Sequence, residues 1–332
     1  MTKKIDVKKI LSQNSIWIVF LLLCVIMTFA SPTFLTLRNF TNLLTTESIK
    51  GIMAIGVMFC ILSRGIDLST AGVLALSSVV SASLVQQVDA TNRIIEGGAP
   101  VFPLVAVIAG ISVGVVFGCI NGSLIAFTKI PPFIATLGSM LVTRALAMAY
   151  TNAVPVPSLT PGFRAIGGGS LIRLGALEVP NVVLAFIIVV IIASFLLTQT
   201  RYGKSVYAVG GNEMAARVAG INVEKTLVKV YMWSSSCAAL AGVLLASRVG
   251  AGNATLGMNF ELDAIAMATV GGVSHSGGIA RMSGVIAGIL LLSVVNNGML
   301  LLGLAAYWQP AVQGIIIVSA VVFDMRKVAK KA

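Results

Sequence analysis

Long apolar runs separated by short polar stretches make up most of the chain. A helix needs about 20 apolar residues to cross a bilayer. On this basis the pattern predicts an all-α polytopic membrane protein with about ten transmembrane helices, near residues 15–31, 48–64, 71–88, 103–127, 131–150, 180–198, 227–248, 263–275, 283–302 and 308–324. The eighth segment is short and broken by glycines, which is typical of a discontinuous or re-entrant segment.

The longest polar stretch runs from Thr198 to Lys229 and has five apolar segments on each side. It contains the signature of a short helix, because Asn212 can cap the N-terminus, Glu213 places a negative charge in the first turn and Gly220 can end the helix. Two helical turns are too short to be stable alone in water. One side of this helix is apolar and needs a cover; it consists of Met214, Ala215, Val218 and Ala219. The stretch is therefore interpreted as a docking element for a soluble partner.

A weak internal repeat relates the two halves of the chain. Asn121-Gly122 recurs as Asn297-Gly298, and each pair lies near the end of an apolar segment that another one follows. Five spans per half is an odd number, so the second half must be inverted relative to the first. The expected organisation is one transmembrane domain, 1–332, with halves at about 15–150 and 180–324 and a loop at 199–229.

Composition agrees with a membrane protein, since hydrophobic residues make up 57% of the chain and charged residues only 10%, against about 25% charged in soluble domains. A net charge of +12 could indicate nucleic-acid binding. However, the basic residues cluster at the termini and in loops, without the interleaved aromatic residues that single-stranded nucleic acid requires. Retention of positive loops in the cytoplasm explains them better, and it predicts that both termini are cytoplasmic.

The segment SRGIDLSTAG, residues 63–72, places Asp67 between two apolar spans. An ionisable group at such a place usually lies in a cavity, an ion pair or an interface. Two interpretations remain open. Asp67 could cap the following helix with help from Ser69 and Thr70, or it could belong to a transport pathway or gate.

Two further acidic residues, Glu261 and Asp263, begin the eighth span at its outer edge. Negative charge at the start of a helix suits the helix dipole, which by itself could explain both residues. Lys50 falls on the same outer side in this topology. The spans would then be nearly free of charge.

No enzymatic or metal chemistry emerges from the sequence. The single histidine, His275, has no acidic or cysteine partner at metal-ligand spacing, and it cannot complete a nucleophile–base–acid set. The run 203–205, Gly-Lys-Ser, resembles the end of a phosphate-binding loop, but Thr198 stands where that motif needs glycine. This chain is therefore not expected to bind ATP by that motif.

An ordered set of motifs resembles bacterial monosaccharide permeases of ATP-binding-cassette (ABC) importers, of the ribose, galactoside and allose type. The motifs are RGIDLSTAG, PPFIATLG, VGGNEMAARVAGINV, ELDAIAMATVGGVSHSGG and YWQPAVQG, and the resemblance runs from about residue 16 to the last span. The chain departs from the family at Arg64, where glycine is common, and at Ile279-Ala280, where a glycine or Lys-Gly is common. The resemblance leaves the particular sugar open.

The resemblance implies a fold like that of type II ABC importer permeases, in the bacterial inner membrane. It implies a second permease subunit, as a homodimer, a cytoplasmic ATPase that binds the ATP, and a periplasmic sugar-binding protein. No cofactor is expected in this chain. The residues expected to lie against the ATPase are Asn212, Glu213, Ala216, Arg217 and Gly220.

The expected mechanism is alternating access, in which ATP binding by the partner biases two states of the membrane subunits. Few polar residues are available to line a pathway, and the candidates are Asp67, Ser69, Asn121, Asn296, Asn297 and Gln309. This scarcity predicts a low-affinity passage, with selectivity held by the binding protein. The alternatives are a secondary transporter, which would need a buried charge pair or relay, and a structural subunit of a membrane complex.

Overall fold

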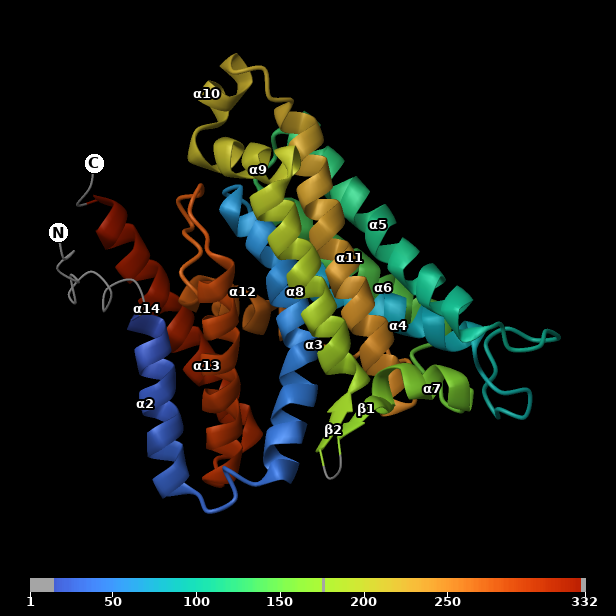
Figure 1. The fold of residues 1–332 in the computed structure, drawn as a ribbon. Coiled ribbons are helices and arrows are strands. Elements are labelled where there is room, and N and C mark those ends of the chain that lie inside the picture. The colour runs from blue at the N-terminus through green and yellow to red at the C-terminus, as the bar shows by residue number, and fades with distance from the viewer. Residues whose placement is uncertain (1–14, 175–176, 330–332) are drawn as a thin grey trace.

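The computed structural model describes residues 15–174 and 177–329, which form a bundle of mostly long helices (Figure 1). The apolar helices of the bundle are α2 (Ser15–Ala30), α3 (Leu37–Leu62), α4 (Thr70–Leu84), α5 (Pro103–Thr128), α6 (Pro132–Thr151), α8 (Asn181–Gln199), α11 (Val223–Val249), α12 (Phe260–Val270), α13 (Met282–Leu301) and α14 (Gln309–Ala329). Each overlaps one of the apolar segments predicted from the sequence. Among the described residues, α3, α5, α6, α8, α11 and α13 are long and apolar enough to cross a membrane.

Polar elements gather at the two ends of the bundle. At one end, α9 (Arg201–Gly211) and α10 (Glu213–Val218) connect α8 to α11, and α10 projects furthest from the bundle (Figure 1). Near the other end lie α7 (Pro161–Gly168) and an antiparallel pair of strands, β1 (Ser170–Leu174) and β2 (Leu177–Pro180). A short 3₁₀ helix, η1 (Ala306–Trp308), precedes α14. We refer to these as the α10 end and the α7 end.

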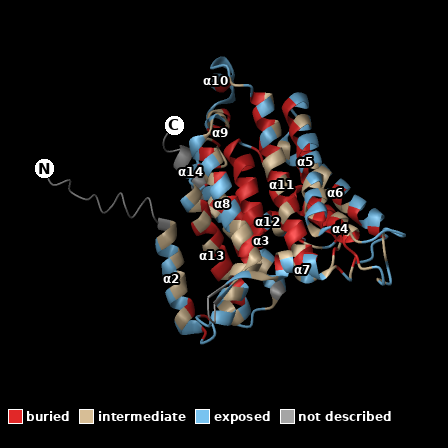
Figure 2. Cartoon of the chain, turned by 45° about the vertical axis from the view of Figure 1, so that its right-hand side comes forward, coloured by how far each residue is buried: buried red, intermediate tan, exposed pale blue. Residues whose placement is uncertain are grey.

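The core of the bundle is built on α3 and α11. Residues of their apolar windows are 83% and 78% buried, against 22% for α5 and for α6. Helices α8 and α12 pack on α3, and α4 and α5 pack on α11. Figure 2 shows this contrast as buried inner helices surrounded by helices with exposed outer faces. The outer faces of α5, α6 and α8 are apolar and are thus available to lipid or to another subunit.

Small residues allow α5 and α11 to approach closely. Glycines recur at every fourth position of α5, at Gly110, Gly114, Gly118 and Gly122. A methyl group added at any of them would lie closer than 3.0 Å to an atom of α11. Such a stripe of small residues is a common way for helices to pack in membranes, where close contact replaces the hydrophobic driving force.

One helix begins much earlier than the sequence pattern predicts. The apolar segment was expected from residue 48, whereas α3 begins at Leu37. The Thr36 side chain caps this start by accepting a hydrogen bond from the Asn39 N–H at 3.3 Å. The first turns of α3 are polar, so hydropathy alone did not reveal them. This extension changes the environment of two charged residues, as described below.

Candidate coupling helix and polar centres

The short helix predicted within the central polar stretch is confirmed as α10. The Asn212 Oδ1 atom accepts a hydrogen bond from the Ala215 N–H at 3.0 Å, Glu213 lies in the first turn, and Gly220 has the positive φ of 81° that glycine adopts beyond a helix end. Asn212, Glu213, Arg217 and Gly220 are all exposed. These residues can therefore meet a partner at the α10 end.

Ala216 differs from the other four predicted coupling residues. Its side chain is only 4% exposed and belongs to a small apolar cluster with Val209, Val223 and Leu227. The expectation that Ala216 lies against the ATPase is therefore corrected, because its side chain packs α10 onto α9 and α11. In contrast, Met214 and Val218 are 71% and 84% exposed. Ala215 and Ala219 are exposed as well, so the whole apolar side predicted for this helix remains uncovered.

Four charged side chains fix α10 on the helices beside it. Arg217 Nη2 lies 2.6 Å from Glu224 Oε1 and 3.4 Å from Glu213 Oε1. Lys129 Nζ, after the end of α5, lies 3.5 Å from the same two carboxylates. The hydrogen bond and charge of Glu224 raise the pKa of Arg217 above its usual value. Exposed pairs add little stability singly, but the network sets the orientation of α10. Sequence reasoning missed Lys129 and Glu224, which only the fold brings here.

Three predicted pathway residues meet in a fully buried polar cluster, which we call the Asp67 centre. Asp67 Oδ1 accepts hydrogen bonds from the Ser69 N–H at 3.0 Å and the Ser69 hydroxyl at 2.5 Å. Asn121 Nδ2 donates to Ser69 Oγ at 2.9 Å. The contact to the Ser69 N–H is a local turn just before α4. Ser69 is the N-cap of α4 and makes no side-chain capping bond there, so the capping interpretation of Asp67 is not confirmed. All three residues have 0% exposure, so none of them lines an open passage in this conformation.

Arg64, where the chain departs from the family pattern, connects the turn before the Asp67 centre to α9. It has a φ of 65°, a backbone region that favours glycine. Its Nε and Nη2 atoms donate to the carbonyl oxygens of Gly210 and Gly211 at 2.7 and 2.6 Å. These carbonyls end α9 directly before the Asn212 cap of α10. The guanidinium therefore links the junction of α9 and α10 directly to the α3–α4 turn.

The remaining pathway candidates lie elsewhere. Asn297 and Asn39 exchange side-chain hydrogen bonds at 2.9 and 3.1 Å. The Asn296 Oδ1 atom accepts from Gln313 at 3.5 Å, and Gln309 begins α14 half-buried. Asn39 stands at the start of α3 and the Asp67 centre just past its end, about 35 Å apart at 1.5 Å per residue. The structure thus divides the six candidates into two groups and does not form one site from them.

A buried ion cluster in the membrane bundle was missed by the sequence analysis. Lys50 Nζ lies 2.9 Å from Asp263 Oδ2 and 3.5 Å from Glu47 Oε1, and the three side chains are 7–9% exposed. The ammonium also lies 5.1 Å from the centre of the Phe260 ring. We call Glu47, Lys50 and Asp263 the Lys50 cluster.

The Lys50 cluster corrects the expectation that the spans are nearly free of charge. Lys50 is not on an outer edge, because the early start of α3 places Glu47 and Lys50 near the middle of that helix. Asp263 belongs to the first turn of the short helix α12, so it has a charge partner as well as a favourable position for the helix dipole. The three-residue spacing of Glu47 and Lys50 is the signal that could have identified their pairing.

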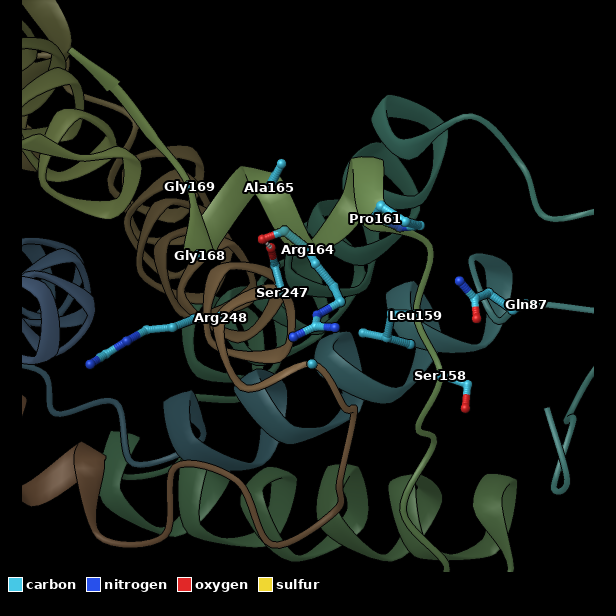
Figure 3. Close-up of a pocket in the computed structure, with 11 residues that line it drawn as sticks. Gln87, Ser158, Leu159, Pro161, Arg164, Ala165, Gly168, Gly169, Ser247 and Arg248 are labelled. Carbon is cyan, nitrogen blue, oxygen red and sulfur yellow. Dashed lines mark hydrogen bonds between the residues drawn. The ribbon is translucent and has the colours of Figure 1, made fainter. Parts of the chain in front are cut away.

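A polar cavity of about 630 Å³ opens near the α7 end (Figure 3). It is lined by α7, the end of α11 and the loop residues Gln87 and Ser158. Arg164 supplies positive charge, whereas the Arg248 guanidinium points away from the other lining residues (Figure 3) and donates to Thr46 Oγ1 at 3.2 Å. The Ser247 hydroxyl holds α7 in place, since it donates to the Phe163 carbonyl at 2.5 Å and accepts from the Gly167 N–H at 2.6 Å. The cavity therefore presents positive charge on a well-fixed frame.

A bundle of apolar helices long enough to cross a membrane, with polar elements at both ends, indicates a multi-pass membrane protein. A family described as "Branched-chain amino acid transport system / permease component" matches residues 39–321. The galactose/methyl galactoside import permease protein MglC of Haemophilus influenzae is 38% identical over 97% of this chain and 96% of its own length. The ribose import permease protein RbsC of Escherichia coli K12 is 39% identical over 96% and 95%.

The chain therefore belongs to the family of monosaccharide permeases of ABC importers. RbsC of Bacillus subtilis is also 39% identical, over 93% of this chain and 91% of its own length. No solved structure matches the chain. As a permease component, the protein is a transport subunit and not an enzyme, and it is a multi-pass protein of the inner membrane.

Proposed function

We propose that this chain forms the transmembrane path of an importer for a monosaccharide of the ribose or galactose kind, driven by ATP that a separate ATPase subunit binds. The observation that carries the proposal is α10: a capped helix of six residues with exposed apolar side chains. Such a short helix persists only when held by packing and covered by a partner. No cofactor is assigned to this chain itself.

The proposed orientation follows from the partners. The ATPase is cytoplasmic, so the α10 end and both termini face the cytoplasm, and the α7 end faces the periplasmic sugar-binding protein. The cationic cavity at the α7 end suits acidic side chains on that protein. A second copy of the permease completes the path, and the exposed apolar faces of α5 and α6 leave room for it.

Ten spans in two inverted halves are part of this proposal. In the first half, α4 is shorter than α3, α5 and α6. In the same order, α12 is shorter than α11, α13 and α14. The chain enters α3 at the end from which it leaves α11, so these corresponding helices run in opposite directions (Figure 1). Opposite direction of matching helices is what inverted repeats require.

In the proposed mechanism, closure of the ATPase moves α10, and the Arg64 link carries this movement to the α3–α4 turn. The membrane halves then alternate between two states whose balance ATP binding shifts. Because the Asp67 centre is fully buried, it acts as a fixed part of this linkage and opens to the path only if the second state exposes it. Selectivity rests mainly with the binding protein.

Uptake of labelled ribose, galactose, allose and inositol tests the proposal directly. Cells with and without the gene are compared under two conditions. In the first, ATP is depleted while the proton gradient is clamped; in the second, the proton gradient is removed while ATP is maintained. We expect gene-dependent uptake of one sugar that stops when ATP is removed. Uptake that survives ATP loss and follows the ion gradient would instead establish a secondary transporter. No gene-dependent uptake of any sugar would favour a structural subunit.

The substitution Arg164→Glu tests the role of the cavity at the α7 end. Arg164 is exposed there, and reversing its charge should oppose acidic groups on the binding protein. We expect the KM for the sugar-loaded binding protein to rise about tenfold while the maximal rate stays within a factor of two. The matched control is Arg38→Glu, an exposed arginine at the start of α3. An equal effect of both substitutions would mean that only the overall charge matters.

A further inference from the structure

Two cavities join along one face of α11 at the α10 end. The first, of about 360 Å³, is lined by the cations Arg201, Lys225 and Lys229. The second, of about 380 Å³, is mainly apolar and is lined by Leu196, Met232 and Trp233 among others. Both cavities share Tyr202 and Lys229. The two therefore form one groove that is basic at its outer part and apolar further along.

The groove follows the spacing of α11. Lys225, Lys229, Met232 and Ser236 recur at intervals of three and four residues, so they lie on one face of the helix. This face extends about 16 Å from Lys225 into the apolar part of α11. Behind these residues, the buried Phe59 of α3 stacks with Tyr202 at 6.2 Å between ring centres and lies 5.6 Å from the Trp233 ring. The aromatic residues at the transition are thus fixed in place.

Tyr202 lines both cavities, and Trp233 lines the apolar one. Their polar atoms, the Tyr202 hydroxyl and the Trp233 Nε1, are buried below the surface of the groove. These two residues therefore present their ring surfaces to a ligand. Tyrosine and tryptophan rings at the boundary between a polar and an apolar region are typical of the membrane interface.

The cations of the groove also lack partners. None of the residues lining the basic cavity is acidic, and across the described residues no carboxylate forms an ion pair with Arg201, Lys225 or Lys229. Lys229 lies over the Tyr202 ring, 5.9 Å from its centre. The site thus offers three positive charges and, beyond the Tyr202 ring, an apolar channel beside α11.

We propose that this groove binds an anionic glycerophospholipid. Its phosphate lies among Arg201, Lys225 and Lys229, and one acyl chain passes the Tyr202 ring and follows Leu196 and Met232. Basic pockets between membrane helices are suited to such headgroups. The acidic surface of a soluble protein would meet the cations but not the apolar part. A free phosphate would leave the apolar part empty.

Lipid retention by the purified full-length protein tests this proposal. Protein taken from membranes of phosphatidylcholine with a minor fraction of phosphatidylglycerol is analysed by native mass spectrometry. We expect the wild type to retain phosphatidylglycerol preferentially. The double substitution Lys225→Gln with Lys229→Gln should lower that retention about tenfold or more.

The matched control removes two exposed cations outside the groove, by Arg281→Gln with Arg326→Gln. It should leave retention unchanged. Equal losses in both double variants, or no preference in the wild type, would overturn the proposal. Displacement of the lipid by millimolar inorganic phosphate would make the groove a site for soluble anions. If the Lys225→Gln with Lys229→Gln variant retains the lipid but no longer co-purifies with the ATPase, the groove is a docking surface for the ATPase. Lipid retention is measured without sugar uptake. A failure of the lipid proposal is therefore distinguishable from a failure of the proposed transport function.

Discussion

Replacing Met214 and Val218 with aspartate is expected to abolish ATP-coupled uptake while the protein stays in the membrane. Both side chains are largely exposed on α10, so aspartate there should be harmless to the fold. Within an apolar docking contact, however, each would bury an unpaired charge. We expect docking of the ATPase to weaken about 30-fold or more. Sugar uptake and co-purification of the ATPase measure this effect.

Conservative changes at the same positions provide the control. Met214→Leu and Val218→Ile keep the apolar surface and should retain most uptake and ATPase binding. Full uptake by the aspartate variants would rule out the docking role of α10. Loss of the protein from the membrane would be inconsistent with the exposure of these two side chains, and membrane levels are therefore measured in parallel.

Replacing Lys50 with methionine is expected to give the largest loss of stability. The substitution leaves the carboxylates of Glu47 and Asp263 buried without their cation. Breaking a buried pair by removing one partner typically costs about 3–5 kcal/mol. We expect a clear fall in the thermal midpoint of the detergent-solubilised protein, measured by size-exclusion chromatography after heating.

A neutral version of the whole cluster separates charge from packing. The triple variant Glu47→Gln, Lys50→Met, Asp263→Asn removes all three charges and should recover most of the stability lost by Lys50→Met alone. If the triple variant is no more stable than the single one, the loss arises from packing around residue 50. A single variant as stable as the wild type would show that the cluster carries no net ion-pair energy.

The Lys50 cluster also bears on how the short helix α12 is held. Helix α12 has only eleven residues and starts with Asn259 in the left-handed region, with a φ of 68°. A helix that begins inside the bundle needs partners for its first turn. Asp263 in that turn is tied to α3 through Lys50. The charge pair therefore fixes a discontinuous segment that apolar packing alone would position less specifically.

Much of the fold was accessible from the sequence because apolar runs in a membrane protein have few alternatives to helices. The α10 helix was predictable in detail, since Asn212 and Gly220 act through their own neighbouring backbone. The family itself was recognisable from ordered local motifs. The contact between Asp67 and Ser69 is likewise local, since the two residues stand two positions apart.

Contacts between distant segments were decided only by tertiary structure. The sequence could not place Lys129 against Glu213, nor Lys50 against Asp263, because such pairs depend on which helix faces pack together. It also grouped Asn121 with Asn297, which the fold separates along α3. Hydropathy gives the length of a membrane helix and hydrogen-bonding caps give its ends, but neither gives the rotation of one helix against another. That rotation is set by close packing, such as the glycine stripe of α5 on α11.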